Sequence, residues 1–547
     1  MQNYAEQEET ATNTAEVMVR CLENEGVKYI FGIPGEENLC FLKALRNSSI
    51  RFITTRHEQG AAFMADVYGR LTGRPGVCLA TLGPGATNLI TGVADANLDG
   101  APLIAITGQV GTDKMHISSH QFIDLVTLFK PITKRSLEVV RPDSVAEIVR
   151  LAFKHAKSEK PGAVHINLPE NIAAMPVTAS PLAIMPHVRV LPSESRLQQA
   201  KLLIENAKHP LILAGYGAVR QYAGDAIVRM AEKLKIPVAN TFMAKGIVPY
   251  TSEYSLWTMG YMMHDYIDEL MDKVDLVIAV GYDLAEVAPK RWNRENKIRI
   301  IHVSTGRADT NTYYQPAVEV VGEIPDSVDE LTRITDPVER EDYSSNVKNR
   351  MREDYEKFAD DSGFPMKPQR ILRDVRKVMG AEDILVSDVG AHKVWVARNY
   401  HCLKPNTCII SNCFASMGIA VPGAAAAKLV HPERKVLAVT GDGGFMMNSQ
   451  ELETANRYGL PFVTLIFDDQ NYGLIKWKEE LKYKDSFYVN FKNPDYKALA
   501  ESMGLKGYQI RKAEDLLPTL EDAFRQQVPA VIDCPVDYSE NMKLYKK

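Results

Sequence analysis

The sequence has no run of about 18 apolar residues, which is the length that a membrane-spanning helix needs. It has no basic stripe either, because 64 Lys and Arg residues are scattered among 69 Asp and Glu residues, giving a formal net charge of −5. These absences argue against a membrane partner and against a nucleic-acid partner. The remaining composition, 45% hydrophobic and 24% charged, is typical of an ordinary globular protein.

Cysteine is scarce, with seven residues that include no CxxC pair. Their odd number, scattered positions and mostly apolar neighbours favour buried thiols over a disulfide framework or a zinc site. The N-terminal segment is polar and acidic, unlike a secretory signal or a transit peptide. We therefore expect a protein of the cytoplasm.

The chain is too long for a single hydrophobic core, since domains of about 150 residues are usual. A first boundary is indicated by residues 176–194, which contain four prolines and no sustained periodicity. A second is indicated by the charged stretch 336–363. We predict three domains, residues 14–177, 195–337 and 365–540.

Each predicted domain alternates short apolar runs with helical patterns, which is typical of parallel sheets covered by helices. The apolar runs lie at 29–32, 51–55, 77–81, 103–107, 163–167, 210–214, 276–280, 298–303, 384–387, 436–440 and 462–467. The fold class predicted from this alternation is α/β, with three doubly wound parallel-sheet domains.

One βαβ unit, residues 436–477, carries the strongest chemical signal. Its first apolar run ends at the sequence GDGG, a helical pattern follows over 448–457, and a second apolar run ends just before Asp469. Parallel strands joined in this way end at one edge of the sheet, so Asp442 and Asp469 are expected to meet there. Two carboxylates at one place favour a hard cation such as Mg²⁺ or Ca²⁺.

The glycines beside Asp442 indicate an anion as the second ligand. Gly441, Gly443 and Gly444 lack side chains, so backbone N–H groups can approach an anion, and the following helix adds the partial positive charge of its N-terminus. The simplest interpretation is a metal-bridged diphosphate site. Because GDGG alone is also a common turn sequence, this interpretation depends on the motifs around it.

The wider pattern resembles the thiamine diphosphate (ThDP) fingerprint, in which GDG is followed by a second acidic or amide residue and then by a sequence such as Asn471-Tyr472-Gly473. The resemblance implies that Mg²⁺ is held by the side chains of Asp442 and Asp469 and by the backbone carbonyl of Asn471. Many members carry Asn at the second position, and Asp469 is similar to the catabolic acetolactate synthases. Gly473 and Leu474 match positions of the cofactor and substrate pocket.

Motifs elsewhere in the chain extend the resemblance to the acetolactate (acetohydroxyacid) synthase family: FGIPGE, RHEQGAAFMADVYGRLTG and GPGATNL in the first domain, and DVGAH in the third. The resemblance implies cofactor-pocket positions at Pro34, Gly35, Pro84, Asn88, Gly390, Ala391, His392 and Met417. Met417 matches the bulky residue between the two rings of the cofactor, and Gln121 matches the glutamine that meets the reaction intermediate.

Glu58 opens a helical pattern, where a carboxylate can simply complement the helix dipole. The small and apolar residues that follow favour burial instead, and burial makes a carboxylate a usable acid near neutral pH. The resemblance implies that Glu58 hydrogen-bonds the aminopyrimidine of ThDP and so generates the nucleophile indirectly.

The central domain lacks a full GxGxxG sequence. In the family this domain carries FAD in the biosynthetic and oxidase branches and is empty in the catabolic branch. The sequence GYDLAEVAPKRWN (281–293) departs from the flavin-binding pattern and resembles the empty one. FAD is therefore possible, but we expect it to be absent.

The resemblance implies decarboxylation of pyruvate and ligation to a second 2-oxo acid, giving 2-acetolactate. It also implies a homodimer or homotetramer with active sites between chains. A plain 2-oxo acid decarboxylase, a flavin-linked pyruvate oxidase and a non-catalytic α/β regulator are the alternatives. The sequence leaves open the acceptor preference, a regulatory subunit, and a role in branched-chain amino-acid synthesis or in acetoin formation.

Overall fold

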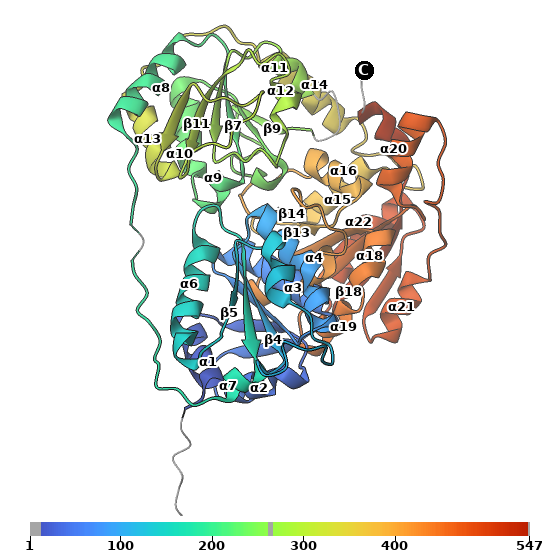
Figure 1. The fold of residues 1–547 in the computed structure, drawn as a ribbon. Coiled ribbons are helices and arrows are strands. Elements are labelled where there is room, and N and C mark those ends of the chain that lie inside the picture. Colours follow the sequence, from blue (N-terminus) through green and yellow to red (C-terminus); the bar gives the residue numbers. More distant parts are fainter. Residues whose placement is uncertain (1–11, 187, 261–265, 545–547) are drawn as a thin grey trace, which may run out of the picture. The chain divides into compact units, whose positions relative to one another are not determined.

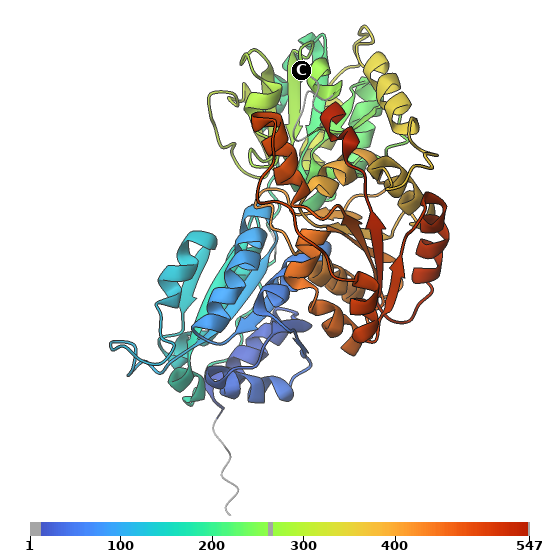
Figure 2. The same cartoon turned by 90° about the vertical axis from the view of Figure 1, so that its right-hand side faces the viewer.

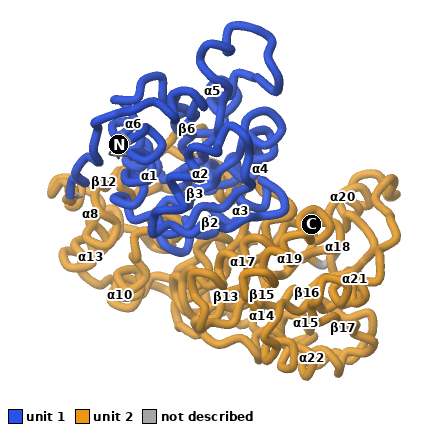
Figure 3. Tube along the Cα trace, turned by 90° about the horizontal axis from the view of Figure 1, so that it is seen from below, with its two compact units in different colours: residues 1–186 blue, residues 187–547 orange. Residues whose placement is uncertain are grey.

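A computed structural model describes residues 12–186, 188–260 and 266–544 (Figure 1). The chain forms two compact units, Met1–Pro186 and His187–Lys547 (Figure 3). Most of the N-terminal segment that entered the cytoplasmic prediction lies outside the described residues. Among the described helices, none has the length and apolarity needed to cross a bilayer.

The first unit is built on a six-stranded parallel sheet with the order β2-β1-β3-β4-β6-β5. Its strands are β1 (Tyr29–Gly32), β2 (Arg51–Thr54), β3 (Gly76–Ala80), β4 (Leu103–Gln109), β5 (Arg135–Glu138) and β6 (Ala163–Pro169). Its helices are α1 (Thr14–Asn24), α2 (Leu39–Arg46), α3 (Glu58–Thr72), α4 (Pro84–Asp99), α5 (Leu125–Phe129), α6 (Val145–Lys157) and α7 (Glu170–Ala174). One face of the sheet packs on α1, α2 and α6, and α3 packs on β3 and on α4.

The second unit contains two more six-stranded parallel sheets, of which the central one has the order β12-β11-β10-β7-β8-β9. Its strands are β7 (Pro210–Ala214), β8 (Val238–Asn240), β9 (Ser255–Thr258), β10 (Leu276–Val280), β11 (Arg299–Ser304) and β12 (Val318–Val321). The helices of this part are α8 (Glu194–Asn206), α9 (Tyr216–Arg220), α10 (Gly224–Leu234), α11 (Tyr266–Met271), α12 (Pro289–Trp292), α13 (Ile324–Ile334) and α14 (Ser345–Glu356). The neighbouring strands β7 and β10 are apolar and wholly buried, as central parallel strands must be.

The third sheet has the order β14-β13-β15-β16-β18-β17. Its strands are β13 (Ile384–Ser387), β14 (Cys408–Ile410), β15 (Val436–Gly441), β16 (Val463–Asp468), β17 (Lys506–Gln509) and β18 (Ala530–Pro535). Its helices are α15 (Pro368–Val378), α16 (Ala391–Asn399), α17 (Ala420–Val430), α18 (Asp442–Asn448), α19 (Glu451–Arg457), α20 (Gly473–Tyr483), α21 (Tyr496–Ser502) and α22 (Leu516–Ala523). Figure 2 shows helices on both sides of these orange to red strands.

The three all-parallel sheets confirm the predicted α/β class. The predicted domain boundaries stay a prediction, and the second and third predicted domains fall within one compact unit. The predicted helix over 448–457 differs from the structure, because α18 begins at Asp442, directly after β15, and α19 covers the rest. The difference matters for the chemistry, since it makes Asp442 the first helical residue after a strand.

Each sheet has a switch point at which the chain changes its winding direction, between β1 and β3, between β7 and β10, and between β13 and β15. At such a switch point the loops that follow two neighbouring strands leave in opposite directions, and a crevice forms at the C-terminal ends of the strands. The fold therefore offers three crevices of the same kind, and the side chains around each decide what it can bind.

Candidate active site

A cavity of about 240 Å³ lies at the C-terminal ends of β13, β15 and β16. Its lining includes every residue proposed above for the third domain: Gly390, Ala391, His392, Met417, Gly441, Asp442, Gly443, Gly444, Asp469, Asn471, Gly473 and Leu474. The lining residues that the sequence analysis did not propose are Val389, Ala415, Tyr472, Ile475 and Tyr538. The structure thus gathers residues from five separate segments at one switch point.

The carboxylate of Asp442 joins the two strand ends of the βαβ unit. Its Oδ1 accepts a hydrogen bond from the Gly443 N–H at 2.8 Å, and its Oδ2 accepts one from the Gln470 N–H at 2.6 Å. Gln470 follows β16, so the carboxylate bridges the loop after β15 and the loop after β16. Burial raises the pKa of Asp442 to about 6, and the negative charge of Asp468 contributes to the rise.

Asp469 lies in the same electrostatic environment. Burial, followed by the negative charge of Asp442, raises the pKa of Asp469 to about 7. Two carboxylates that disfavour each other's charge in a partly buried place are stabilised by a cation between them. Their oxygen atoms are the donors that Mg²⁺ prefers.

Two buried polar atoms at the cavity, Asn471 Oδ1 and His392 Nε2, have no hydrogen-bond partner among the residues that the structure describes. Asn471, whose backbone carbonyl is the predicted third ligand, lines the cavity together with the two carboxylates. Burial lowers the pKa of His392 to about 3, which leaves a neutral ring. Within the described residues, no group of three or more His, Cys, Asp and Glu side chains could hold a metal ion. The donor set is therefore two carboxylates completed by Asn471, and it fits a hard cation bridged to an anionic ligand.

Two glycines keep the floor of the cavity free of side chains. A Cβ on Gly443 would lie 2.7 Å from Cε1 of Tyr472, and a Cβ on Gly444 would lie 3.1 Å from the Asp388 carboxyl carbon. The close packing of Tyr472 and Asp388 against the start of α18 therefore requires glycine at these two positions.

Asn493 is a residue of this site that the sequence analysis missed. Its Nδ2 donates to Asp442 Oδ2 at 2.8 Å and to Asp468 Oδ1 at 2.7 Å. One amide group thus holds the carboxylates of Asp442 and Asp468 at fixed positions. Residues that hydrogen-bond a metal ligand in this way fix its orientation toward the metal. No local pattern marks Asn493, because it lies 51 positions from Asp442 in the sequence.

A second set of missed residues fixes the position of Met417. The following residue, Gly418, donates its N–H to Oδ1 of Asp388 at 2.8 Å, and its carbonyl accepts from Asn448 Nδ2 at 2.9 Å. Gly418 has φ +94°, a conformation that favours glycine. Burial raises the pKa of Asp388 to about 6. The backbone after Met417 is held from both sides, so its side chain has a defined place in the cavity wall.

The first unit presents its own group of proposed residues at the switch point of its sheet. Glu58 is the first residue of α3, directly after β2, and its side chain is buried, with 8% of the residue exposed. Asn88 Nδ2 donates to Glu58 Oε2 at 3.0 Å. The structure therefore brings Glu58 and Asn88 together from the N-terminal ends of two helices, α3 and α4.

The remaining proposed residues of the first unit lie around the loop after β3. A Cβ on Gly35 would lie 2.3 Å from the Thr81 Cβ, so only glycine allows this approach. Pro34 precedes Gly35 on the same loop, and Pro84 is the first residue of α4. Gln121 is exposed, and its backbone oxygen would lie 2.8 Å from a Cβ on Gly83. Pro34, Gly35, Pro84 and Gln121 thus lie in or next to loops that follow β1 and β3, two neighbouring strands of the sheet.

Three family descriptions match the chain in order. They are the thiamine pyrophosphate enzyme N-terminal TPP binding domain at residues 12–128, the central domain at 197–331 and the C-terminal TPP binding domain at 388–534. The chain therefore belongs to the family of thiamine diphosphate (thiamine pyrophosphate) enzymes.

Within this family the chain is similar to acetolactate synthases. It is 34% identical over 536 residues to the acetolactate synthase of Bacillus subtilis, covering 97% of this chain and 94% of the relative. It is 34% identical over 535 residues to the catabolic acetolactate synthase of Raoultella terrigena, covering 96% and 95%. It is 32% identical over 550 residues to the acetolactate synthase large subunit of Corynebacterium glutamicum, covering 95% and 86%.

Proposed function

We propose that this chain is a ThDP- and Mg²⁺-dependent enzyme that decarboxylates pyruvate and ligates the remaining two-carbon unit to a second 2-oxo acid, giving 2-acetolactate. The observation that carries the proposal is the cavity in which Asp442, Asp469 and Asn471 meet beside the glycines of α18. The similarity to acetolactate synthases along nearly the whole chain supports it.

In this proposal the residues of the cavity hold the cofactor. Asp442, Asp469 and Asn471 supply oxygen atoms to Mg²⁺, and the backbone around Gly443 and Gly444 faces the diphosphate. Bound ThDP supplies the carbanion that attacks the 2-oxo acid and the electron sink for its decarboxylation. Each of these roles follows from the type and burial of the residue and stays a proposal.

Glu58 would hold and move a proton at its carboxylate in this scheme. The hydrogen bond from Asn88 fixes one carboxylate oxygen, so the other can face a ring nitrogen of the aminopyrimidine. Burial of Glu58 excludes the water that would otherwise compete for this proton. Gln121, exposed beside the same loop, would meet the bound substrate.

The central sheet supports a flavin-free enzyme. At its switch point, Oε1 and Oε2 of Glu286 accept hydrogen bonds from the Tyr216 N–H at 3.0 and 3.1 Å, and the Thr241 hydroxyl also donates to Oε2. A dinucleotide phosphate would need the same donors at the start of α9. The carboxyl group of Glu286 thus occupies donors that a phosphate would need.

The surrounding backbone leaves little space for a ligand at this second switch point. Gly281 has φ +59°, and a Cβ on it would lie 2.1 Å from the backbone nitrogen of Ala218. The two loops therefore pack backbone against backbone. We propose that no FAD binds here, as in the catabolic branch of the family.

Large apolar side chains around the active-site cavity support assembly into a homodimer or homotetramer. Phe414, Met446, Met447, Tyr472 and Ile475 are each between 41% and 48% exposed. An exposed apolar patch of this kind is typical of a surface covered by another chain. We propose that a second copy of the chain supplies the group around Glu58 to this cavity.

We also propose that the enzyme acts in the cytoplasm, where its seven thiols remain reduced.

One product assay tests the proposal. Purified protein is given ThDP, Mg²⁺ and pyruvate after its absorption spectrum has been recorded. Acetolactate from a colourless protein is the expected result. Acetaldehyde alone would identify a decarboxylase, a yellow protein a flavin-linked oxidase, and a failure to bind ThDP a non-catalytic regulator.

A further inference from the structure

The seven cysteines, all of them free thiols, differ in how well their surroundings accept a thiolate. Burial raises the pKa of four of them, namely Cys21, Cys40, Cys78 and Cys534. Cys402 differs from these four, because a hydrogen bond from the Cys408 thiol lowers its pKa to about 7. Since the thiolate and not the thiol is the nucleophile, the surroundings of Cys402 favour its reactive form.

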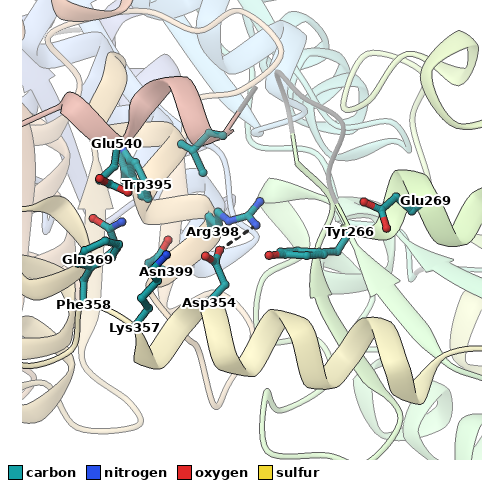
Figure 4. Close-up of a pocket in the computed structure, with 11 residues that line it drawn as sticks. Tyr266, Glu269, Asp354, Lys357, Phe358, Gln369, Trp395, Arg398, Asn399 and Glu540 are labelled. Carbon is teal, nitrogen blue, oxygen red and sulfur yellow. Dashed lines mark hydrogen bonds and ion pairs between the residues drawn. The ribbon is translucent and has the colours of Figure 1, made fainter. Parts of the chain in front are cut away.

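Cys402 and Cys408 lie at the two ends of a short reversal of the chain. Cys402 is the third residue after α16, the helix that carries Trp395 in Figure 4. Cys408 is the first residue of β14, the edge strand that pairs with β13. The Thr407 hydroxyl donates to the Lys404 carbonyl at 2.8 Å and so closes the turn. The two cysteines are 3% and 4% exposed and belong to the same apolar core.

A buried lysine completes this group. Lys245 is 4% exposed, and its ammonium nitrogen donates to the Thr258 hydroxyl at 3.1 Å and to the Ala397 carbonyl at 2.7 Å. Burial lowers the pKa of Lys245, and the thiols of Cys402 and Cys408 oppose this. In the described part of the chain no carboxylate pairs with Lys245. A buried ammonium group needs an anion beside it, and the thiolate of Cys402 supplies one.

The segment that carries Lys245 packs directly on the turn between the cysteines. Gly246 has φ +81°, and a Cβ on it would lie 2.1 Å from the Lys404 carbonyl oxygen and 2.9 Å from the Cys402 Cβ. The Tyr250 N–H donates to the Cys402 carbonyl at 3.4 Å. The backbone contacts therefore fix the lysine and the two thiols relative to one another.

We propose that Cys402 and Cys408 are a dithiol that reacts with hydrogen peroxide and closes into an intrachain disulfide. The Cys402 thiolate attacks one peroxide oxygen, so an S–O bond forms, the O–O bond breaks, and the leaving hydroxide takes a proton from Lys245. The amine of Lys245 then accepts the proton of Cys408, whose sulfur attacks the sulfur of the Cys402 sulfenic acid. An S–S bond forms, the S–O bond breaks, and the second hydroxide takes that proton from Lys245. Two thiols are thereby oxidised, and one peroxide is reduced to two water molecules.

Both the burial of the pair and a reducing compartment fit a small oxidant. In the cytoplasm disulfides are mostly transient and form where a thiol senses or consumes an oxidant. Lys404 is exposed and residues 403, 405 and 406 are partly exposed, so a single turn separates the pair from water. Local opening of such a turn admits a molecule as small as hydrogen peroxide. The site does not depend on which reaction the active-site cavity catalyses.

The first experiment gives the full chain, with ThDP and Mg²⁺, one equivalent of hydrogen peroxide. The remaining thiols are then blocked with iodoacetamide in urea, and the peptides are mapped without reduction. The peptide that contains Cys402 and Cys408 should escape alkylation at both thiols and weigh two hydrogen atoms less, and dithiothreitol should restore it. No such peptide, or earlier oxidation of the half-buried Cys40, would overturn the proposal.

Single-thiol variants separate the two steps. In Cys408→Ser the second step is blocked, so the sulfenic acid of Cys402 should accumulate and react with dimedone. In Cys402→Ser the nucleophile is missing, so Cys408 should stay reduced. Cys40→Ser, at a thiol outside the pair, should leave the rate of disulfide formation unchanged. Oxidation of Cys408 in Cys402→Ser at the rate of the unchanged protein would reject the assigned order of attack.

The pH dependence of the first step tests the electrostatic part of the proposal. The charged and titratable groups that act on the Cys402 thiol are Lys245, Arg376, Tyr400 and Cys408. In the unchanged protein the rate should be half-maximal near pH 7, where this thiol loses its proton. Lys245→Met keeps the apolar stem without the charge, so the midpoint should move to higher pH and the rate at neutral pH should fall by about tenfold. A midpoint at about pH 8.5 in the unchanged protein, as in an ordinary thiol, would overturn the proposal without any variant.

Discussion

The central and third sheets of the second unit reverse direction in the same way, yet their switch points differ in content. At the third sheet, Asp442 and Asp469 line a cavity of about 240 Å³. At the central sheet, Glu286 fills the corresponding place and accepts hydrogen bonds from the loops around it. The same topology thus carries a cavity in one case and a buried, hydrogen-bonded carboxyl group in the other, so the side chains give each switch point its character.

The carboxyl groups at the two switch points also differ in their surroundings. At the third sheet, burial and the negative charge of Asp442 raise the pKa of Asp469, so a cation beside the two carboxylates would stabilise their charged forms. The carboxylate at the central sheet is satisfied by the backbone N–H groups of Tyr216 and Asp283. Replacing Asp442 at the third sheet should therefore mainly weaken ligand binding. Replacing Glu286 at the central sheet should mainly change the stability of the fold.

The largest loss of activity is expected from a change at the switch point of the first sheet, where Glu58 lies. Glu58→Gln keeps the size and the contact with Asn88 but removes the exchangeable charge. Turnover should fall by about 10²- to 10⁴-fold, because a positioned acid or base contributes about that much. ThDP binding, measured by calorimetry, should stay nearly unchanged. Turnover close to that of the unchanged protein would exclude Glu58 from proton transfer.

The next effect is expected at the switch point of the third sheet. Asp442→Ala removes one carboxylate of the proposed metal site, so the Mg²⁺ affinity measured through Mg²⁺-dependent ThDP binding should fall by more than about 100-fold. Asp272→Ala, at an exposed carboxylate of the same unit, is the control and should have no effect. An Asp442→Ala protein that still needs only the original Mg²⁺ concentration would disprove this metal site.

The central strands and the pairing of Asp442 with Asp469 could be predicted from the sequence, because they depend on local patterns. The strands β1, β7, β10 and β13 have the predicted bounds, since each is a short apolar run that ends at glycine or at a polar residue. Asp442 and Asp469 could be placed together because a βαβ unit brings its strand ends to one edge.

The rest depends on contacts between distant residues. Strands β5 (RSLE) and β17 (KGYQ) are polar edge strands, held by pairing with a single neighbour rather than by their own pattern. Asn493 and Asn448 act through hydrogen bonds to residues 51 and 30 positions away. Glu286 lies in a segment that the sequence analysis compared only with flavin-binding patterns, so its hydrogen bonds to Tyr216 and Thr241 could not be predicted.

The switch point of the central sheet gives a pH-dependent stability. Burial raises the pKa of Glu286 from 4.5 to about 7. A raised pKa in the folded state means that the stabilising contribution is complete below pH 4.5 and is lost as the pH rises through 7. The free energy of unfolding should therefore fall by about 3 kcal/mol across this window because of Glu286 alone.

Glu286→Gln tests this sign, since an amide does not titrate. Urea unfolding from pH 4.5 to 8 should show a smaller loss of stability in Glu286→Gln than in the unchanged protein. The exposed Glu295→Gln should retain the original slope. Identical slopes in all three proteins would mean that Glu286 remains charged in the folded state at every pH tested, and that the central switch point is held by a permanent anion.

The smallest effect is expected at Asn493, which separates the geometry of the switch point of the third sheet from its charge. Asn493→Leu leaves both carboxylates in place but removes the two hydrogen bonds that orient Asp442 and Asp468. Partners of this kind contribute about 10- to 100-fold to metal affinity, so the Mg²⁺ requirement should rise by about tenfold while turnover at saturating Mg²⁺ stays close to normal. Asn206→Leu, at an exposed asparagine of α8, should change neither. If Asn493→Leu instead lowered turnover at saturating Mg²⁺ and left the Mg²⁺ requirement unchanged, the amide would act on the substrate side of the cavity, and charge alone would define the metal site.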